Sequence, residues 1–256
     1  MIEISVIVAA WNAAATLERC IASIAAQQGI NGLEIIVVND CSTDNTAAVI
    51  ARLQQRYPNR PLLAIGWSLG GNMLVNLLAR TPDLPLQAAM VISAPLLLAS
   101  CSDRVNRGFS RVYQTYLLKS LRGNLERKRQ QVPGADKRWS ADQIAAIGTL
   151  RQFDELVTAP LHGFASADDY YQRCSGLPLL GTIGIPTLII HAADDPFMSE
   201  AVIPAAHALS PTVRYELSRC GGHVGFMYGT PWRPRYWLEE RVSAWLSDWQ
   251  RQASGQ

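Results

Sequence analysis

The sequence feature that most limits the fold is a serine between two glycines, where a strand is followed directly by a helix. Pro61-Leu62-Leu63-Ala64-Ile65 is short and apolar, which predicts a buried strand, and residues 71–80 have helical spacing of their apolar side chains. The intervening Gly66-Trp67-Ser68-Leu69-Gly70 matches G-x-S-x-G, a turn that presents a nucleophilic hydroxyl. The alternative interpretation is a glycine-rich turn with an unreactive serine.

Two further residues fit a catalytic triad with Ser68. Asp195 follows a predicted strand at 186–191, and His223 lies in a glycine-framed turn after a predicted strand at 213–217. Parallel strands bring their carboxyl ends to one edge of the sheet, where distant residues can meet. The three residues occur in the order serine, acid, histidine. In such a triad the imidazole activates the serine hydroxyl, and the carboxylate orients the imidazole. We therefore predict Ser68, Asp195 and His223 as catalytic residues.

Each of these assignments has competitors in the sequence. Asp194 is the alternative acid, but Asp195 directly precedes Pro196, and Asp194 fits a carboxylate that caps the loop. Among the other histidines, His191 ends a predicted strand and is expected to hydrogen-bond in the core. His207 is expected on a surface helix, and His162 in the helical insertion.

Acyl transfer also needs backbone N–H groups that stabilise an oxyanion. The residue after the nucleophile, Leu69, should supply one. The loop Ala10-Trp11-Asn12, which follows the first predicted strand, stands where a second donor belongs, so Trp11 is our candidate. We expect no metal and no organic cofactor.

Composition narrows the class of protein. The 256 residues are 48% hydrophobic and 17% charged with a net charge of +2, which favours a globular protein and argues against a nucleic-acid binder. No apolar run approaches the roughly 20 residues of a membrane span, and no basic segment of a signal peptide precedes residue 4. The five scattered cysteines fit reduced thiols, so a cytoplasmic location is expected.

The order of elements predicts one α/β domain without an interdomain linker. A β-α-β-α segment at 1–57 would complete the sheet, 58–97 and 185–256 would form the core, and 98–184 would be a helical cap. A closing helix is predicted from Trp232 to Trp249. Residues 104–138 contain ten Lys and Arg against Glu126 and Asp136. Solvated helix faces are the ordinary explanation for this basic stretch, and contact with anionic lipid headgroups is the alternative.

The N-terminal segment resembles the opening of a family 2 glycosyltransferase. The similarity rests on residues 5–12 and 34–44, and covers about the first 55 residues. In that family an aspartate matching Asp40 contacts the nucleotide base of a sugar donor. The family also needs a D-x-D-type motif for its metal, and this chain contains no Asp-x-Asp. Nucleotide-sugar transfer is therefore an alternative function that lacks its metal site.

The rest of the chain resembles the YheT-like branch of the α/β-hydrolases. The matching blocks occur in family order and lie at 64–74, 91–95, 108–113, 151–159, 168–175, 191–197 and 221–226. The resemblance implies a mostly parallel sheet with a helical cap, although the usual leading antiparallel strands have no counterpart before Ile4. It also implies a serine hydrolase acting on a small-molecule ester with a hydrophobic or lipid-like acyl group. A catalytically silent binding protein with this fold is a further alternative.

Overall fold

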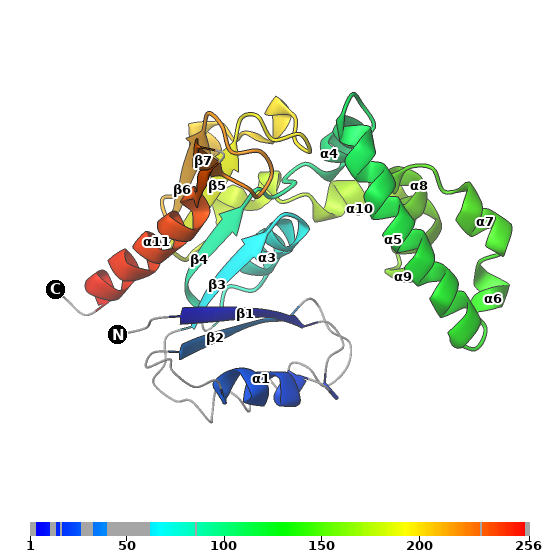
Figure 1. Ribbon diagram of the computed structural model, residues 1–256, viewed down its shortest axis with the longest axis horizontal. Coiled ribbons are helices and arrows are strands. Elements are labelled where there is room, and N and C mark those ends of the chain that lie inside the picture. Colours follow the sequence, from blue (N-terminus) through cyan, green and yellow to red (C-terminus); the bar gives the residue numbers. More distant parts are fainter. Residues whose placement is uncertain are drawn as a thin grey trace.

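A parallel four-stranded sheet forms the centre of the protein. The computed structural model describes residues 4–10, 14–15, 17–26, 33–39, 62–84, 86–230 and 232–253. Adjacent strands of the sheet are all parallel, in the order β3-β4-β5-β6 (Figure 1). Their bounds are β3 Leu62–Trp67, β4 Leu86–Ile92, β5 Thr187–Ala192 and β6 Val213–Ser218. The predicted α/β fold class is therefore confirmed.

Successive strand residues point to opposite faces of this sheet, and among the described elements a helix packs on each face. Ala64, Val91 and Ile189 pack with residues of α3 (Leu69–Arg80) in one apolar cluster. Ile65 and Ile190 pack on the other face with Leu238 of α11 (Trp237–Ala253). β4 and β5 are buried on both faces, which explains why they are continuous apolar runs, whereas β6 is partly exposed and carries charged residues.

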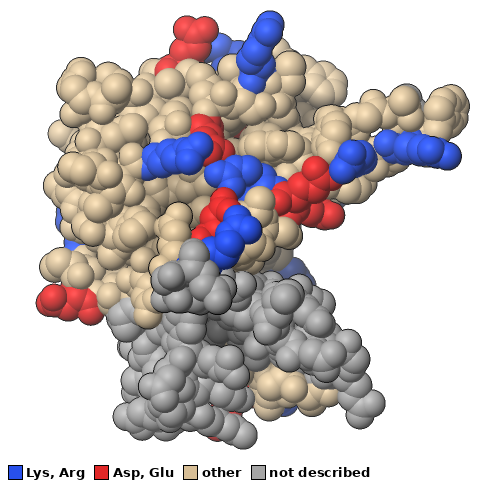
Figure 2. All heavy atoms as spheres, turned by 90° about the vertical axis from the view of Figure 1, so that its left-hand side faces the viewer, with Lys and Arg blue, Asp and Glu red and all other residues tan. Residues whose placement is uncertain are grey.

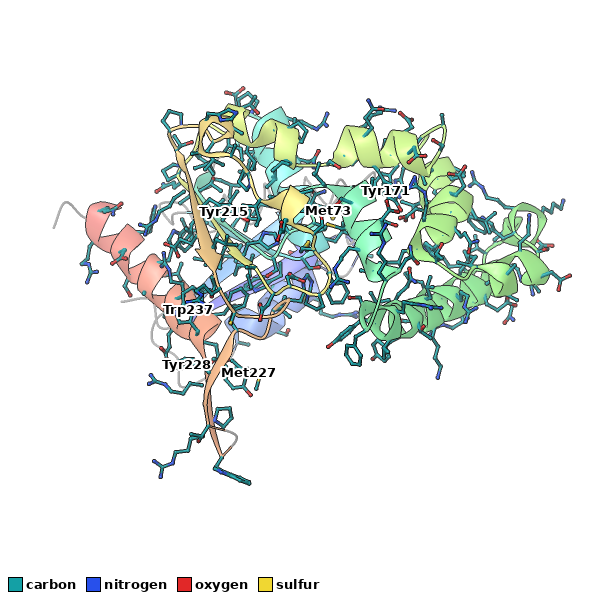
Figure 3. All side chains as sticks on the ribbon, turned by 90° about the horizontal axis from the view of Figure 1, so that it is seen from above. Met73, Tyr171, Tyr215, Met227, Tyr228 and Trp237 are labelled. Carbon is teal, nitrogen blue, oxygen red and sulfur yellow. The ribbon has the colours of Figure 1, made fainter. Side chains whose placement is uncertain are left out.

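The closing helix begins later than the sequence predicted. β7 (Met227–Thr230) and β8 (Arg233–Tyr236) pair as an antiparallel hairpin, and only after them does α11 start. Pro234 lies in this hairpin, and a proline has no N–H to donate within a helix. The hairpin projects from the body with Met227 and Tyr228 at its base (Figure 3), and all eight of its strand residues are exposed.

The insertion between β4 and β5 is helical, as predicted. It has an apolar cluster of its own around Leu118, Trp139 and Val157. Its helices are α4 Leu98–Val105, α5 Ser110–Gln131, α6 Ala135–Arg138, α7 Ala141–Ala146, α8 Leu150–Phe153, the π-helical turn η1 Asp154–Thr158, α9 Ala159–Leu161 and α10 Ala167–Cys174. Three 3₁₀ turns follow: η2 Leu177–Thr182 before β5, then η3 Glu200–Val202 and η4 Ala206–Ala208 after it.

The N-terminal segment forms a small sheet of its own in the part of the chain that the structure describes. β1 (Ile4–Ala10) and β2 (Leu33–Asn39) pair in parallel, and α1 (Leu17–Ala25) connects them with Leu17 and Ile21 buried. This pair is not hydrogen-bonded to β3 there, contrary to the expected completion of the larger sheet. The predicted helix at 47–57 lies outside the described residues, and the division into domains stays a prediction.

Opposite charges are interleaved on the side of the molecule that carries α11 (Figure 2). Glu216 of β6 accepts two hydrogen bonds from the Arg241 guanidinium, at 2.7 and 2.9 Å, and this bonding holds its pKa below the usual range. The pair ties α11 to the edge strand.

Within the described ranges, no helix has the length and apolarity needed to cross a membrane. The four cysteines placed there form no disulfide.

Candidate active site

Ser68 occupies a strained turn between β3 and α3. Its φ of 50° and ψ of −128° are rare for a residue with a side chain. The Ser68 N–H donates to the Ile92 carbonyl of β4 at 2.8 Å, which fixes the turn against the sheet. Such strain persists only where the surroundings over-determine it, and it is typical of a nucleophile elbow.

Close approach of strand and helix depends on Gly66 and Gly71. A Cβ at Gly66 would lie 2.7 Å from the Gly70 carbonyl oxygen, and one at Gly71 would lie 2.9 Å from the Gly66 carbonyl oxygen. At Gly70 itself, an added Cβ would meet no described atom within 4 Å. Gly70, the second glycine of the G-x-S-x-G motif, is therefore not required for the contact between β3 and α3. Gly71, which directly follows the motif, is required for it.

The structure brings the three predicted triad residues together. His223 Nε2 lies 2.8 Å from Ser68 Oγ, and His223 Nδ1 lies 2.8 Å from Asp195 Oδ2. The Asp195 side chain is completely buried, and its other oxygen accepts from the Phe197 N–H at 2.8 Å. With Nδ1 protonated towards the carboxylate, Nε2 is left to accept a proton from the serine.

Asp194 holds the loop that carries His223. Its Oδ1 accepts hydrogen bonds from the Gly221 and Gly222 N–H groups at 2.8 and 2.9 Å, so its interpretation as a loop-capping carboxylate is confirmed. A Cβ at Gly221 would lie 2.6 Å from the Phe226 ring, and Gly222 has a φ of 61°. Both glycines are therefore needed for the turn.

The cap packs directly on the loop that carries Asp195. The Ser110 hydroxyl at the start of α5 donates to the Pro196 carbonyl at 2.6 Å. Tyr113 of α5 contacts the Phe197 ring at 5.2 Å between centroids, and Phe197 in turn lies 4.4 Å from the His223 ring. The cap therefore helps to fix both the acid and the histidine. Phe197 was not predicted from the sequence, although its place two residues after Asp195 is a usable signal.

Asn72 is a second residue that sequence reasoning missed. It is buried in the first turn of α3, where its Nδ2 donates to the Cys174 carbonyl and its Oδ1 accepts from the Gly176 N–H, both at 2.8 Å. These bonds join the helix that follows Ser68 to the segment that leaves the cap. Its only sequence signal was a polar residue on the apolar face of a predicted helix.

One histidine differs from its predicted role. His191 is buried at the end of β5, but neither ring nitrogen has a hydrogen-bond partner among the described atoms. The expected core hydrogen bond is therefore wrong. Burial lowers the pKa of His191 to about 4, with a smaller opposing effect of Asp195, so the ring is neutral near pH 7.

The predicted oxyanion donors are only partly described. Leu69 is the first residue of α3, and the first amides of a helix have no partner within it, which suits the predicted role. Trp11 and Asp40 lie outside the described residues. No group of three His, Cys, Asp or Glu side chains that could hold a metal ion occurs in the part of the chain that is placed.

The fold and this constellation agree with the comparison to known families. The model for the alpha/beta hydrolase fold matches residues 21–230, and the chain belongs to this family. The match runs through most of the segment in which we saw a resemblance to glycosyltransferases, and no comparison supports that resemblance.

Three curated relatives of the chain are named as an esterase, a phospholipase and a lipase. It is 47% identical over 206 residues to "Putative esterase YheT" of Escherichia coli, covering 80% of this chain and 60% of that protein. It is 32% identical over 191 residues to phospholipase ABHD3 of Mus musculus, covering 73% and 46%. Identity to monoacylglycerol lipase of Saccharomyces cerevisiae is 28%, covering 75% and 44%. The chain thus spans roughly half the length of these relatives.

Proposed function

We propose that this protein hydrolyses carboxylic esters with hydrophobic acyl groups through a covalent acyl-enzyme on Ser68. The observation that carries the proposal is the continuous contact from Ser68 Oγ to His223 to the buried Asp195, with both distances at 2.8 Å. Nucleophile, base and orienting carboxylate then stand in the order that acyl transfer needs.

The first half of the reaction forms the acyl-enzyme. His223 Nε2 takes the hydroxyl proton as Ser68 Oγ attacks the ester carbonyl, and Asp195 stabilises the resulting imidazolium. The Leu69 N–H donates to the oxyanion, and Trp11 remains our candidate for the second donor. The carbon–oxygen bond of the ester then breaks, and the alcohol leaves with the proton from His223.

The second half releases the acid. A water molecule gives its proton to His223 Nε2 and attacks the acyl carbon. The proton then returns to Ser68 Oγ as the serine leaves, so the enzyme is regenerated. Every proton transfer passes through one imidazole, and the cycle calls for no metal or organic cofactor.

A hydrophobic acyl group is supported by an apolar surface beside the triad. Five side chains at helical spacing around the start of α5 are exposed, and we call them the α5 apolar stripe: Phe109, Val112, Tyr113, Tyr116 and Leu117. Phe197 links this stripe to His223 by ring contacts. An acyl chain lying along the stripe would cover apolar surface that water otherwise contacts. The names of the phospholipase and lipase relatives agree with such a substrate.

Labelling with a fluorophosphonate probe tests the role of Ser68. The wild-type protein should be labelled, and Ser68→Ala should lose labelling together with at least about 10³-fold of ester hydrolysis. Ser93→Ala is a matched control, because Ser93 also directly follows a strand with positive φ (49°) and its hydroxyl has no described hydrogen-bond partner. Persistent labelling of Ser68→Ala would reject Ser68 as the nucleophile. A folded wild-type protein without labelling would favour a silent binding protein.

The acyl preference is tested separately with p-nitrophenyl esters of increasing chain length. We expect kcat/KM to rise from acetate to decanoate. Tyr113→Ala should reduce kcat/KM for decanoate several-fold more than for acetate. A preference for acetate, or an equal loss for both esters, would reject the lipid-like substrate and leave the role of Ser68 standing.

A further inference from the structure

The cap contains a cavity that the proposed reaction does not use. Its volume is about 550 Å³, within the usual size range of sites for small ligands. It lies between the C-terminal half of α5, α6, η1 and α9. Its lining residues are Leu121, Asn124, Leu125, Lys128, Val132, Pro133, Gly134, Ala135, Arg138, Trp139, Phe153, Val157 and Leu161.

This cavity is separate from the candidate active site. All of its described lining residues fall between positions 121 and 161. The triad residues stand on the turn after β3 and on the loops after β5 and β6. Figure 1 shows α5, α6 and α9 extending away from the sheet, so a ligand in the cavity would be bound by the cap alone.

The lining has the character of an amphiphile site. Aliphatic and aromatic side chains predominate, and the Trp139 Nε1–H donates to the Leu156 carbonyl at 3.1 Å, so this polar atom is satisfied outside the cavity. Val132 and Leu161 are 51% and 44% exposed, which makes part of the lining accessible from solvent. A hydrocarbon chain could therefore enter and cover apolar surface.

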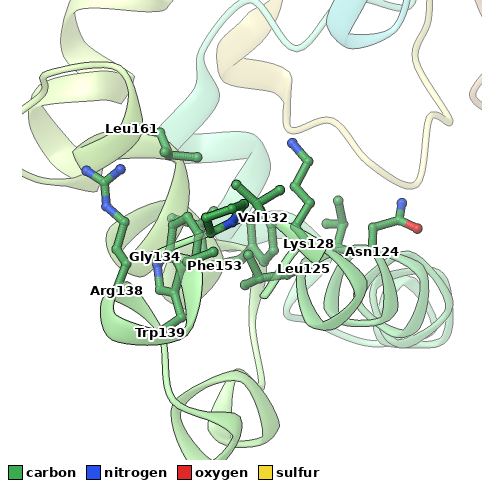
Figure 4. Close-up of a pocket in the computed structure, with 13 residues that line it drawn as sticks. Asn124, Leu125, Lys128, Val132, Gly134, Arg138, Trp139, Phe153 and Leu161 are labelled. Carbon is green, nitrogen blue, oxygen red and sulfur yellow. The ribbon is translucent and has the colours of Figure 1, made fainter. Parts of the chain in front are cut away.

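The charged lining residues that the structure describes are both cations. Lys128 and Arg138 flank the apolar side chains on opposite sides (Figure 4). Neither acid of the basic stretch, Glu126 or Asp136, belongs to the lining. The charge of the cavity is thus complementary to an anionic head group and opposed to a cationic one.

We propose that this cap cavity is a second binding site, specific for the carboxylate of a long-chain fatty acid. The hydrocarbon chain lies on the apolar lining, and the carboxylate pairs with Lys128 or Arg138. The choice of a fatty acid deepens the proposed function, since hydrolysis of a lipid-like ester releases such an acid. The binding itself depends only on the cap, and it needs no turnover at Ser68.

Calorimetric titration of dodecanoate, below its micelle concentration, into the full-length Ser68→Ala protein tests the site. Dodecanoate should bind, whereas butyrate should bind at least ten-fold more weakly because it lacks the chain. Dodecyltrimethylammonium should also bind at least ten-fold more weakly, because its head group has the wrong charge. Equal affinity for the cationic amphiphile, or absence of dodecanoate binding, would overturn the proposal.

A pair of double variants with the same charge change locates the bound carboxylate. Lys128→Glu with Arg138→Glu should weaken dodecanoate binding at least ten-fold. Arg127→Glu with Lys137→Glu is the matched control, because each change is one position earlier and neither residue lines the cavity. The control should retain its affinity. Equal effects of the two pairs, or unchanged affinity in the first, would overturn the site.

A steric variant covers the case in which the charge reversals disturb the fold. Val132→Trp fills the cavity from its exposed edge and leaves both cations in place. Dodecanoate affinity should fall while the circular dichroism spectrum is retained, and retained affinity would contradict the proposal. Since these titrations measure binding without hydrolysis, their failure and the failure of Ser68 labelling are distinguishable.

Discussion

At the scale of the residue, the candidate site depends on positions that a short motif does not distinguish. Ser68 can hold its unusual backbone conformation because β3 and α3 pass each other where Gly66 and Gly71 have no side chains. The two glycines of the pentapeptide are not equivalent. Gly66 is in contact with the helix backbone, whereas Gly70 faces open space among the described atoms.

Alanine substitutions at adjacent glycines should therefore differ sharply. Gly71→Ala forces a methyl group against the Gly66 carbonyl, so we expect a loss of about 1–3 kcal/mol in the free energy of unfolding and of most activity. Gly70→Ala should be neutral or stabilise by up to about 1 kcal/mol, because alanine favours a helix. Urea unfolding and ester hydrolysis measure both effects. Similar losses for the two variants would contradict this account of the turn.

At the scale of the element, α3 joins the nucleophile to the exit of the cap. Asn72, Asn76 and Arg80 lie along one side of the helix and donate to the carbonyls of Cys174 and Arg173. Asn72 also satisfies the buried Gly176 N–H. The helix that begins at the serine thus holds the segment on which the cap returns to the sheet.

Removing the Asn72 side-chain amide should lower the free energy of unfolding more than removing the Asn76 side-chain amide. In Asn72→Ala the Gly176 N–H loses its partner in a buried site, and we expect a loss of about 2–3 kcal/mol in the free energy of unfolding. In Asn76→Ala the Cys174 carbonyl keeps its bond from Asn72, so about 1 kcal/mol or less is expected. Chemical denaturation compares the two variants, and equal losses would argue against a special role for Asn72.

At the scale of the whole molecule, the free energy of unfolding depends on pH through His191, which is buried at the end of β5. His191 resists protonation in the folded state, with a pKa of about 4 against an ordinary value of 6.5. The unfolded chain binds this proton below pH 6.5 and the folded chain does not. The contribution of His191 to stability is therefore fully present above pH 6.5 and is lost as the pH falls towards 4.

Replacement of His191 should remove part of this acid sensitivity. Between pH 6.5 and 4, the wild-type protein should lose about 3 kcal/mol more of its free energy of unfolding than His191→Leu, from the difference of the two pKa values. Urea unfolding across this range provides the measurement. His207→Gln, which removes an exposed histidine instead of a buried one, is the control. Parallel curves for the wild type and His191→Leu would contradict the assignment.

Local sequence patterns determined the main elements and the identity of the candidate triad. The apolar run before Ser68, the order serine, acid, histidine, and the glycines beside His223 are all visible without coordinates, because each reflects a local steric or chemical need. The sequence also predicted a helical cap between β4 and β5. It failed at the start of the closing helix, which was predicted from Trp232, because β8 (Arg233–Tyr236) of the hairpin with Pro234 precedes α11 there.

Only the tertiary structure decided which residues from distant segments meet. Packing between elements determines the contact of Phe197 with His223, the bonds of Asn72 across more than one hundred residues, and the burial of His191 without a hydrogen-bond partner among the described atoms. The cap cavity likewise arises from the packing of successive helices over residues 121–161. Sequence spacing encodes the local faces and turns, whereas distances between elements depend on how those faces fit together.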